Sequence, residues 1–197
     1  MERVAVIGAG AVGDALAGAL RRGGLDVAVG VRTPAGPAET TVADAIAGAG
    51  AVVVAIPGAA VEAFAAEHGP ALAGRVVLDA SNDLSGGHDG PMHHMDAWAS
   101  QAPGALVCRA FNTIGHENVS APGFPDGVAD LFWCGPEAAR ARAERLIAAT
   151  GMRPVRVGGP EAAGVLDGVA RLWFTLAFTQ GRGRRLAFRM LGGGGEA

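Results

Sequence analysis

Residues 4–13 read VAVIGAGAVG, and this stretch constrains the fold more than any other part of the sequence. A short apolar run, typical of a strand, leads into three glycines and then into an alanine-rich, helix-like segment. In such a strand–turn–helix unit, Gly8 permits the tight turn, Gly10 lets backbone amides approach a pyrophosphate, and Gly13 allows the helix to pack closely on the strand. The stretch therefore predicts a dinucleotide-binding site near the start of the chain.

Strand-like and helix-like segments alternate along the rest of the chain. Continuous apolar strands between helices indicate a mostly parallel sheet covered on both faces, the Rossmann-type doubly wound α/β class, here with a short C-terminal helical extension. The predicted strands are residues 3–7, 26–30, 51–56, 75–79, 105–110, 129–134 and 153–157. The predicted helices are residues 11–22, 42–47, 59–66, 95–101, 136–150 and 161–190.

Composition and charge exclude several classes of protein. The net charge of −3 argues against a nucleic-acid partner, which would require a clustered basic face. The apolar stretch 51–66 is interrupted by Pro57, Gly58 and Glu62, so we expect no membrane span. Cys108 and Cys134 form no CxxC motif and lie in predicted strands, which favours a buried, reduced pair. A reduced pair favours the cytoplasm, and with no basic leader at the N-terminus we expect no signal peptide.

The second predicted strand ends in an arginine where such units usually carry an acid. Residues 27–33 read VAVGVRT. A carboxylate there would accept hydrogen bonds from ribose hydroxyls and repel a 2′-phosphate, whereas a guanidinium donates to that phosphate. Arg32 therefore predicts a preference for NADP(H), with Thr33 as a further donor; the alternative is that Arg32 is only a surface charge.

We expect an NADP-binding Rossmann domain over residues 1–158, a helical segment over 159–191 and a disordered tail over 192–197.

Three later segments follow predicted strands and belong to the ligand edge of a parallel sheet. The stretch AIPG (55–58) offers Ile56 and Pro57 as an apolar wall for the cofactor. The stretches ASNDL (80–84) and RAFNTIGHENV (109–119) bring five polar side chains to the place where a nicotinamide and a hydride acceptor would meet: Ser81, Asn82, Asn112, Thr113 and His116. Hydride transfer depends mainly on placement and water exclusion, so no separate catalytic residue is required. His116 is a possible exception, with a ligand-facing role and a surface-loop role both open.

Two charged clusters have simpler interpretations. The histidines and aspartate at positions 88, 89, 93 and 94 match no fixed metal-ligand spacing, so we expect a polar loop and no metal site. Near the C-terminus, four arginines form either a solvated helix face or a site for an anionic ligand: Arg182, Arg184, Arg185 and Arg189.

The motifs taken together resemble a specific family. The chain contains, in order, VIGAGAVGDALAGAL, VAVGVRT, VVVAIPGAAV, VVLDASNDL, RAFNTIG, TGMRPVRVGG and GRGRRLAFRML. This combination resembles the NADPH-dependent reductases of the deazaflavin coenzyme F420, over nearly the whole chain. The resemblance implies an enzyme, often a homodimer, that transfers a hydride between NADPH and coenzyme F420 as co-substrate, with a small C-terminal helical part closing over the nicotinamide.

The resemblance also implies residue roles. The pyrophosphate would lie against Ala9, Gly10, Ala11 and Val12, and the 2′-phosphate against Val31, Arg32 and Thr33. The rest of the cofactor would contact Ile56, Ala60, Asn82 and His116, and Arg185 in the last helix would lie close to the deazaflavin. Two features depart from the family: Val31 stands where a serine is common, and segment 83–98 has no counterpart.

Two other functions remain open at this point. The same fold could reduce a small metabolite that carries an imine or an activated alkene, which the unmatched segment 83–98 favours. A non-catalytic NADP(H)-sensing protein is the third possibility, because no proton donor is evident in the sequence.

Overall fold

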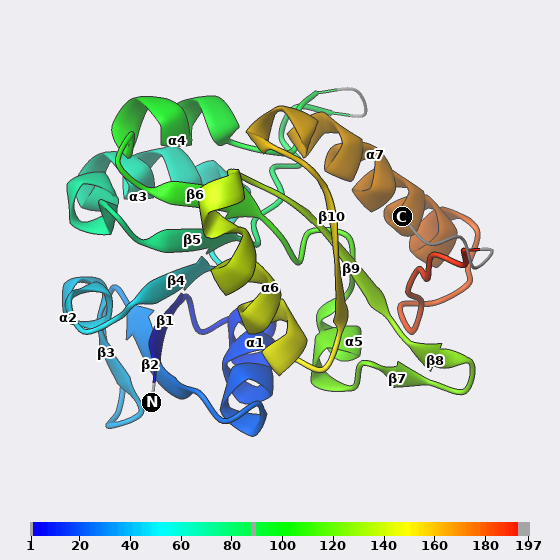
Figure 1. Cartoon of the computed structure of the whole chain (residues 1–197), viewed down its shortest axis with the longest axis horizontal. Helices are drawn as coiled ribbons and strands as arrows, with labels where there is room; N and C mark the ends of the chain where they lie inside the picture. The colour runs from blue at the N-terminus through cyan, green and yellow to red at the C-terminus, as the bar shows by residue number, and fades with distance from the viewer. Residues whose placement is uncertain (1, 88–89, 193–197) are drawn as a thin grey trace.

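A computed structural model describes residues 2–87 and 90–192, and one eight-stranded sheet runs through it (Figure 1). The strand order is β10-β9-β6-β5-β4-β1-β2-β3, and within it β9 is antiparallel to β6 while the other neighbours are parallel. These strands are β1 (Arg3–Ile7), β2 (Asp26–Val31), β3 (Glu39–Thr41), β4 (Ala51–Val54), β5 (Val76–Asp79), β6 (Leu106–Arg109), β9 (Asp130–Cys134) and β10 (Arg153–Gly158). A separate hairpin pairs β7 (Gly123–Phe124) with β8 (Gly127–Val128).

The helices complete the doubly wound architecture that the sequence predicts. They are α1 (Ala11–Arg22), α2 (Val42–Ala47), α3 (Val61–His68), α4 (Met95–Gln101), α5 (His116–Ser120), α6 (Arg140–Ala149) and α7 (Ala163–Phe174). Short 3-10 turns cover Gly58–Ala60, Gly69–Leu72, Glu137–Ala139 and Pro160–Ala162. The predicted fold class is confirmed. None of the helices in the described residues has the length and apolar character needed to cross a membrane.

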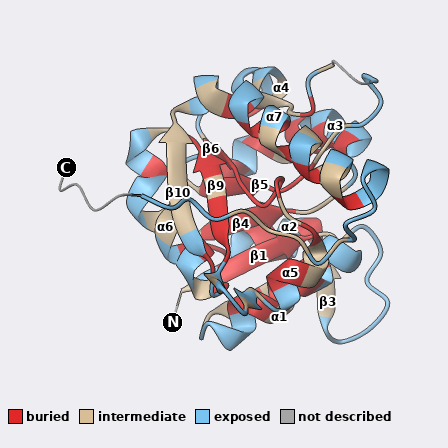
Figure 2. Ribbon diagram, turned by 90° about the vertical axis from the view of Figure 1, so that its right-hand side faces the viewer, coloured by how far each residue is buried: buried red, intermediate tan, exposed pale blue. Residues whose placement is uncertain are grey.

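Each face of the sheet carries its own apolar core, because successive side chains of a strand point to opposite sides. In β1, Val4 and Val6 pack with α1 and α6, whereas Ala5 and Ile7 pack with α2, α3 and α4. The central strands β4 and β5 are buried throughout, and the neighbouring β1 is buried from Val4 to Ile7 (Figure 2). Continuous apolar strands were therefore the correct signal for a sheet covered on both sides.

The last predicted helix, residues 161–190, is wrong in its extent. After α7 the chain makes a π-helical turn over Thr175–Thr179, and residues 180–192 form neither helix nor strand. Gly181 and Gly183 adopt left-handed backbone angles, with φ of 64° and 78°, which an α-helix does not tolerate. The GRG sequence thus ends the helix, and of the predicted disordered tail 192–197, residues 193–197 lie outside the described residues.

Residues 180–192, which we call the C-terminal strap, run back along α5, the hairpin and β9. Asn118 of α5 donates to the carbonyls of Arg184 and Leu186, at 2.9 and 3.0 Å. The amide of Met190 donates to the Asp130 carboxylate at 2.7 Å, and Arg153 binds the same carboxylate. The strap is therefore an integral part of the fold.

Candidate cofactor and hydride-transfer site

The glycine turn between β1 and α1 is held by close backbone contacts. Gly8 has φ of +109°, and its amide donates to the Gly30 carbonyl of β2 at 2.9 Å. A Cβ on Gly8 would lie 2.4 Å from the Ala55 carbonyl oxygen, and one on Gly13 would lie 2.0 Å from the Gly8 carbonyl oxygen. The turn and the helix can approach the sheet only because these two positions carry no side chain.

Gly10 differs from the other two glycines because its missing side chain faces open space. No protein atom lies within 4 Å of where its Cβ would be. Gly10 is the N-cap of the 12-residue helix α1, and no side chain caps the first amides of that helix. Ala9, Ala11 and Val12 are exposed around it. The free amides and the helix dipole make this end of α1 suited to an anionic group such as a pyrophosphate.

The end of β2 presents a free cation at the same edge of the sheet. Arg32 and Thr33 are exposed, and Val31 is half-buried against the core. Among the described residues, no hydrogen bond or ion pair engages the Arg32 side chain. The following loop is closed by Glu39, which accepts a hydrogen bond from the Ala35 amide at 2.8 Å. A guanidinium without a protein partner is available for a phosphate.

The ends of β4 and β5 meet through backbone contact. Ile56 is half-buried, and Pro57 and Ala60 are exposed after β4. A Cβ on Gly58 would lie 2.6 Å from the backbone oxygen of Asn82, so the loop after β4 passes directly over the loop after β5. The apolar segment expected along the cofactor thus lies beside Asn82, as the parallel strand order requires.

Beneath that loop, Asp79 organises the end of β5. Its Oδ1 accepts hydrogen bonds from the amide of Ser81 at 2.8 Å and from the Ser81 hydroxyl at 2.6 Å. Its Oδ2 accepts from the indole Nε1 of Trp98, on α4, at 2.9 Å. All three residues are buried. The turn that presents Asn82 is therefore fixed from below by three hydrogen bonds to one carboxyl group.

The end of β6 lies against this turn. Phe111 adopts a left-handed φ of 68°, rare for an aromatic residue, and starts the turn that carries Asn112. The Asn112 amide group donates to the carbonyls of Asp79 and Ser81, at 3.2 and 2.6 Å. Its Oδ1 is buried and has no partner among the described residues. A buried acceptor left without a donor is available to an amide donor such as the nicotinamide carboxamide.

A buried ion pair joins β6 to α7. Arg109 is fully buried, and its Nη2 lies 2.7 Å from Asp167 Oδ1. The same guanidinium donates to the Ser81 carbonyl at 2.9 Å and to Asn82 Oδ1 at 2.7 Å. Burial lowers the pKa of Arg109, and the neighbouring carboxylates of Asp167 and Asp79 oppose that shift. Asn82, Ser81 and Asn112 are thus brought together as predicted.

His116 lies in a second polar group at the start of α5. Its Nδ1 is 3.2 Å from Arg184 Nη2 and 3.6 Å from Glu117 Oε2, and its side chain is about one-third exposed. The hydrogen bond from Arg184 lowers the pKa of Glu117. Arg184 also lies over the rings of Trp173 and Phe178. The structure therefore places His116 against the strap, separately from the hydrogen-bonded group around Asn82.

The arginine cluster near the C-terminus is not a helix face. Arg185 belongs to the strap, where its guanidinium donates to Asn118 Oδ1 and to the Gly123 carbonyl, and it stacks on Phe124. Arg189 donates to the Asp126 carbonyl at 2.6 Å. Arg185 lies in a segment that is neither helix nor strand, which corrects its expected helical setting; its predicted role at the deazaflavin stays a prediction.

The histidine-rich segment lies beside α7. His93 Nε2 is 4.0 Å from Asp167 Oδ2, and His94 Nε2 is 3.5 Å from Asp83 Oδ2. Positions 88 and 89 lie outside the described residues. Across the described ranges 2–87 and 90–192, no group of three possible metal ligands comes together.

Cys108 and Cys134 are buried free thiols, and burial raises their pKa to about 12 and about 11.

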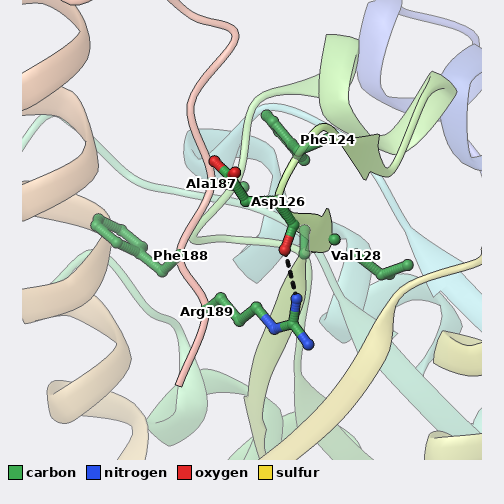
Figure 3. A pocket seen from close by; sticks show the side chains of 8 residues that line it. Phe124, Asp126, Val128, Ala187, Phe188 and Arg189 are labelled. Carbon is green, nitrogen blue, oxygen red and sulfur yellow. Dashed lines mark hydrogen bonds between the residues drawn. The ribbon is translucent and has the colours of Figure 1, made fainter. Parts of the chain in front are cut away.

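A hollow of about 210 Å³ lies between the β7–β8 hairpin and the strap (Figure 3). It is lined by Phe124, Asp126, Gly127, Val128, Ala129, Ala187, Phe188 and Arg189. These are not the residues that the sequence predicts for the cofactor or the acceptor. The hollow is therefore separate from the glycine turn and from Asn82.

Sequence reasoning missed four residues that build the site: Asp79, Trp98, Arg109 and Asp167. Asp79 and Arg109 end the apolar strands VVLD and LVCR, and a charge at the end of a buried strand is a usable signal. Asp167 and Trp98 come from distant helices, so only the tertiary structure reveals their partners.

Residues 3–83 match the family model described as NADP oxidoreductase, coenzyme F420-dependent. The matched stretch contains the glycine turn, Arg32 and Asn82. The resemblance predicted from the sequence is confirmed. No curated protein matches the chain.

Solved structures extend the likeness beyond this stretch. A protein from Arthrobacter sp. FB24, proposed to be an F420-dependent NADP-reductase, is 26% identical with a TM-score of 0.83, covering 97% of this chain and 100% of that one. A hypothetical protein from Sinorhizobium meliloti is 28% identical with a TM-score of 0.70, covering 83% of this chain and 88% of that one.

A more distant likeness involves an imine reductase from Aspergillus terreus, solved with NADPH4 and dibenz[c,e]azepine. It is 21% identical with a TM-score of 0.69, and 92% of this chain aligns with only 63% of the imine reductase. This likeness concerns the fold alone. The family match and the Arthrobacter structure together support an NADP-dependent oxidoreductase.

Proposed function

We propose that the protein is an NADP(H)-dependent oxidoreductase that transfers a hydride between NADPH and coenzyme F420 or a related acceptor. The observation that carries this proposal is the pairing of two features at one edge of the sheet. The open space at Gly10 lies before the uncapped end of α1, and Arg32 carries a guanidinium without a protein partner. The first suits a pyrophosphate and the second a 2′-phosphate.

The residues present fit an NADP(H) cofactor along the whole edge. The pyrophosphate would be held by the amides of Ala9 to Val12, and the 2′-phosphate by Arg32 and Thr33. Ile56, Pro57 and Ala60 would form the apolar wall, with Asn82 and Asn112 at the nicotinamide end. The orphaned Oδ1 of Asn112 is the specific feature of this structure that supports the last assignment.

The chain's own contribution to the reaction is placement. When bound, the cofactor supplies a hydride. Hydrogen-bonded Ser81, Asn82 and Asn112 form a rigid wall, and fixed groups need no reorganisation as the reaction proceeds. The sequence predicts His116 for this edge, but its imidazole lies against the strap, where Arg184 Nη2 is 3.2 Å from its Nδ1. It is the group we assign to hold or move a proton for an acceptor that requires one.

Coenzyme F420 is the acceptor we favour, because the family match and the Arthrobacter structure both carry that description. The predicted acceptor contacts are Asn112, Thr113 and Arg185. An imine or activated alkene is the second candidate, favoured by the fold shared with the imine reductase. A non-catalytic NADP(H) sensor is the third, and it predicts tight binding without turnover.

A homodimer in the cytoplasm completes the proposal. The outward face of α7 supports the dimer, since Val165 and Leu172 are 59% and 50% exposed on it. Large apolar side chains on one helix face suit a second copy of the chain. Light scattering coupled to size-exclusion chromatography measures the mass directly, and a monomer at micromolar protein would contradict the dimer.

The experiment that tests the proposal compares cofactors and then acceptors. Arg32→Ala should weaken NADPH binding by about 1.5–3 kcal/mol, roughly 10- to 150-fold, and leave NADH binding nearly unchanged. Arg140→Ala, an exposed arginine on α6, is the matched control. Equal losses for both cofactors would refute the phosphate role. Stopped-flow absorbance with NADPH and F420 tests the acceptor, and turnover only with a cyclic imine would favour the second candidate.

A further inference from the structure

Arg109 carries a full positive charge in the protein interior, where burying a charge costs free energy. Its side chain has no exposed surface, and its Nε has no partner among the described residues. Replacing a buried ion pair by well-packed apolar residues is often neutral or stabilising, so stability alone does not explain such a residue. The position of its partners suggests what it does.

Arg109 and its neighbours form a closed ring of hydrogen bonds. Arg109 Nη2 donates to Asn82 Oδ1 at 2.7 Å and to Asp167 Oδ1 at 2.7 Å. Asp167 Oδ2 accepts from the Met92 amide at 2.8 Å, and the Met92 carbonyl accepts from the amide of Asp83 at 2.9 Å. Asp83 follows Asn82 in the chain, which closes the ring. The loop after β5, β6, α7 and the segment before α4 are thereby locked together.

Asn82 is the member of the ring that reaches the ligand edge. Its Oδ1 accepts from Arg109, and its Nδ2 donates to the Asn112 carbonyl at 3.0 Å. Both ends of the carboxamide are therefore fixed, and the second hydrogen of Nδ2 remains to donate. The residue is half-buried, so this hydrogen can reach a ligand at the surface of the edge.

We propose that Arg109 is a positioning residue that orients the Asn82 carboxamide toward the nicotinamide half of the cofactor, with Asp167 of α7 holding Arg109 in place. The proposal rests on the proposed function, because it requires an NADP(H) site at this edge. It adds a link that the glycine motif does not contain: α7 and the segment before α4 set the geometry of the cofactor's reacting end.

The test uses two ligands that differ at the nicotinamide end. NADPH spans the whole edge, whereas 2′,5′-ADP carries the 2′-phosphate without a nicotinamide. Arg109→Met should weaken NADPH binding about tenfold or more and change 2′,5′-ADP binding less than twofold. Arg109→Lys keeps the charge and should restore part of the loss. Arg156→Met is the matched control, a half-buried arginine that donates to the Gly135 carbonyl.

A double-mutant cycle separates positioning from general damage. Asn82→Ala should weaken NADPH as much as Arg109→Met, and the double variant should lose no more than either single one, because Arg109 acts through Asn82. Multiplying losses would overturn the proposal, as would an equal loss of 2′,5′-ADP in a folded Arg109→Met protein. If that variant fails to fold, the Arg109→Lys and Asn82→Ala pair decides by the same criterion.

Failure of the proposed function gives a different result. Wild-type protein that binds neither NADPH nor 2′,5′-ADP would remove the proposed function and the inference together. Wild-type protein that binds both, combined with Arg109→Met that binds NADPH normally, would remove only the inference.

Discussion

Two alanine substitutions in the glycine turn should separate folding from binding. At Gly10 an added Cβ meets no protein atom within 4 Å, and φ is −87°, which alanine readily adopts. Alanine is a poorer N-cap than glycine, by up to about 1 kcal/mol, but it lowers the entropy of the unfolded chain by a similar amount. Gly10→Ala should therefore leave the free energy of unfolding within about 1 kcal/mol of wild type.

Gly13→Ala should behave in the opposite way. Its Cβ would lie 2.0 Å from the Gly8 carbonyl oxygen, so α1 must move away from β1. Overpacking of this kind costs about 1–3 kcal/mol or more. The measurement is urea unfolding of both variants without cofactor.

Binding should rank the two variants differently from stability. The methyl group of Gly10→Ala would occupy the space in front of the α1 amides, so NADPH affinity should fall at least tenfold, about 1.4 kcal/mol. Isothermal titration of the folded variant measures this loss. Wild-type affinity in Gly10→Ala, or destabilisation as large as in Gly13→Ala, would refute the assignment of that space to the cofactor.

Two further predictions concern buried polar groups. Trp98→Phe should cost about 2–4 kcal/mol because it removes the hydrogen bond to Asp79, whereas Trp133→Phe should cost less, since the Trp133 Nε1 has no partner among the described residues; equal urea midpoints would contradict this. Burial raises the pKa of Asp130, but hydrogen bonds, including those from Arg153, outweigh burial and lower the pKa overall, so the ionised carboxylate should stabilise the fold above about pH 4 and lose that effect as the pH falls further. Asp130→Asn should therefore be less stable than wild type by about 1–2 kcal/mol at pH 7, and the difference in the free energy of unfolding should shrink at pH 3.

The alternation of strands and helices could be predicted because it rests on local patterns. The predictions of the apolar strands and of the glycine turn were correct, because a strand buried on one or both faces has a recognisable pattern of apolar residues. The three-residue strand β3 and the hairpin β7–β8 were missed, because their pairing depends on neighbours and not on their own composition. The end of the last helix was misplaced because its apolar pattern continues past Gly181, where the left-handed backbone ends it.

The candidate site could be predicted where a single local unit or the order of the parallel strands determines it. The predicted roles of Gly10 and Arg32 rest on their places in a strand–turn–helix unit, and the structure leaves both positions open to a ligand. The grouping of Ser81, Asn82 and Asn112 followed from the shared edge of a parallel sheet. Arg109 and Asp167 are 58 positions apart, and no pattern along the chain reports that they meet. Long-range electrostatic pairs of this kind are visible only in three dimensions.

The strap also determines which part of the protein folds last during synthesis. Asn118 of α5 binds the carbonyls of Arg184 and Leu186, which are 66 and 68 positions later in the chain, and Asp130 binds the amide of Met190, 60 positions later. While the chain leaves the ribosome, these groups lack their partners in the strap until almost the last described residue has emerged. The Rossmann strands β1 to β6 can pair well before that moment. During translation, the half that we expect to bind the adenosine end of the cofactor can thus assemble first, and the region around α5 and the hairpin is completed last.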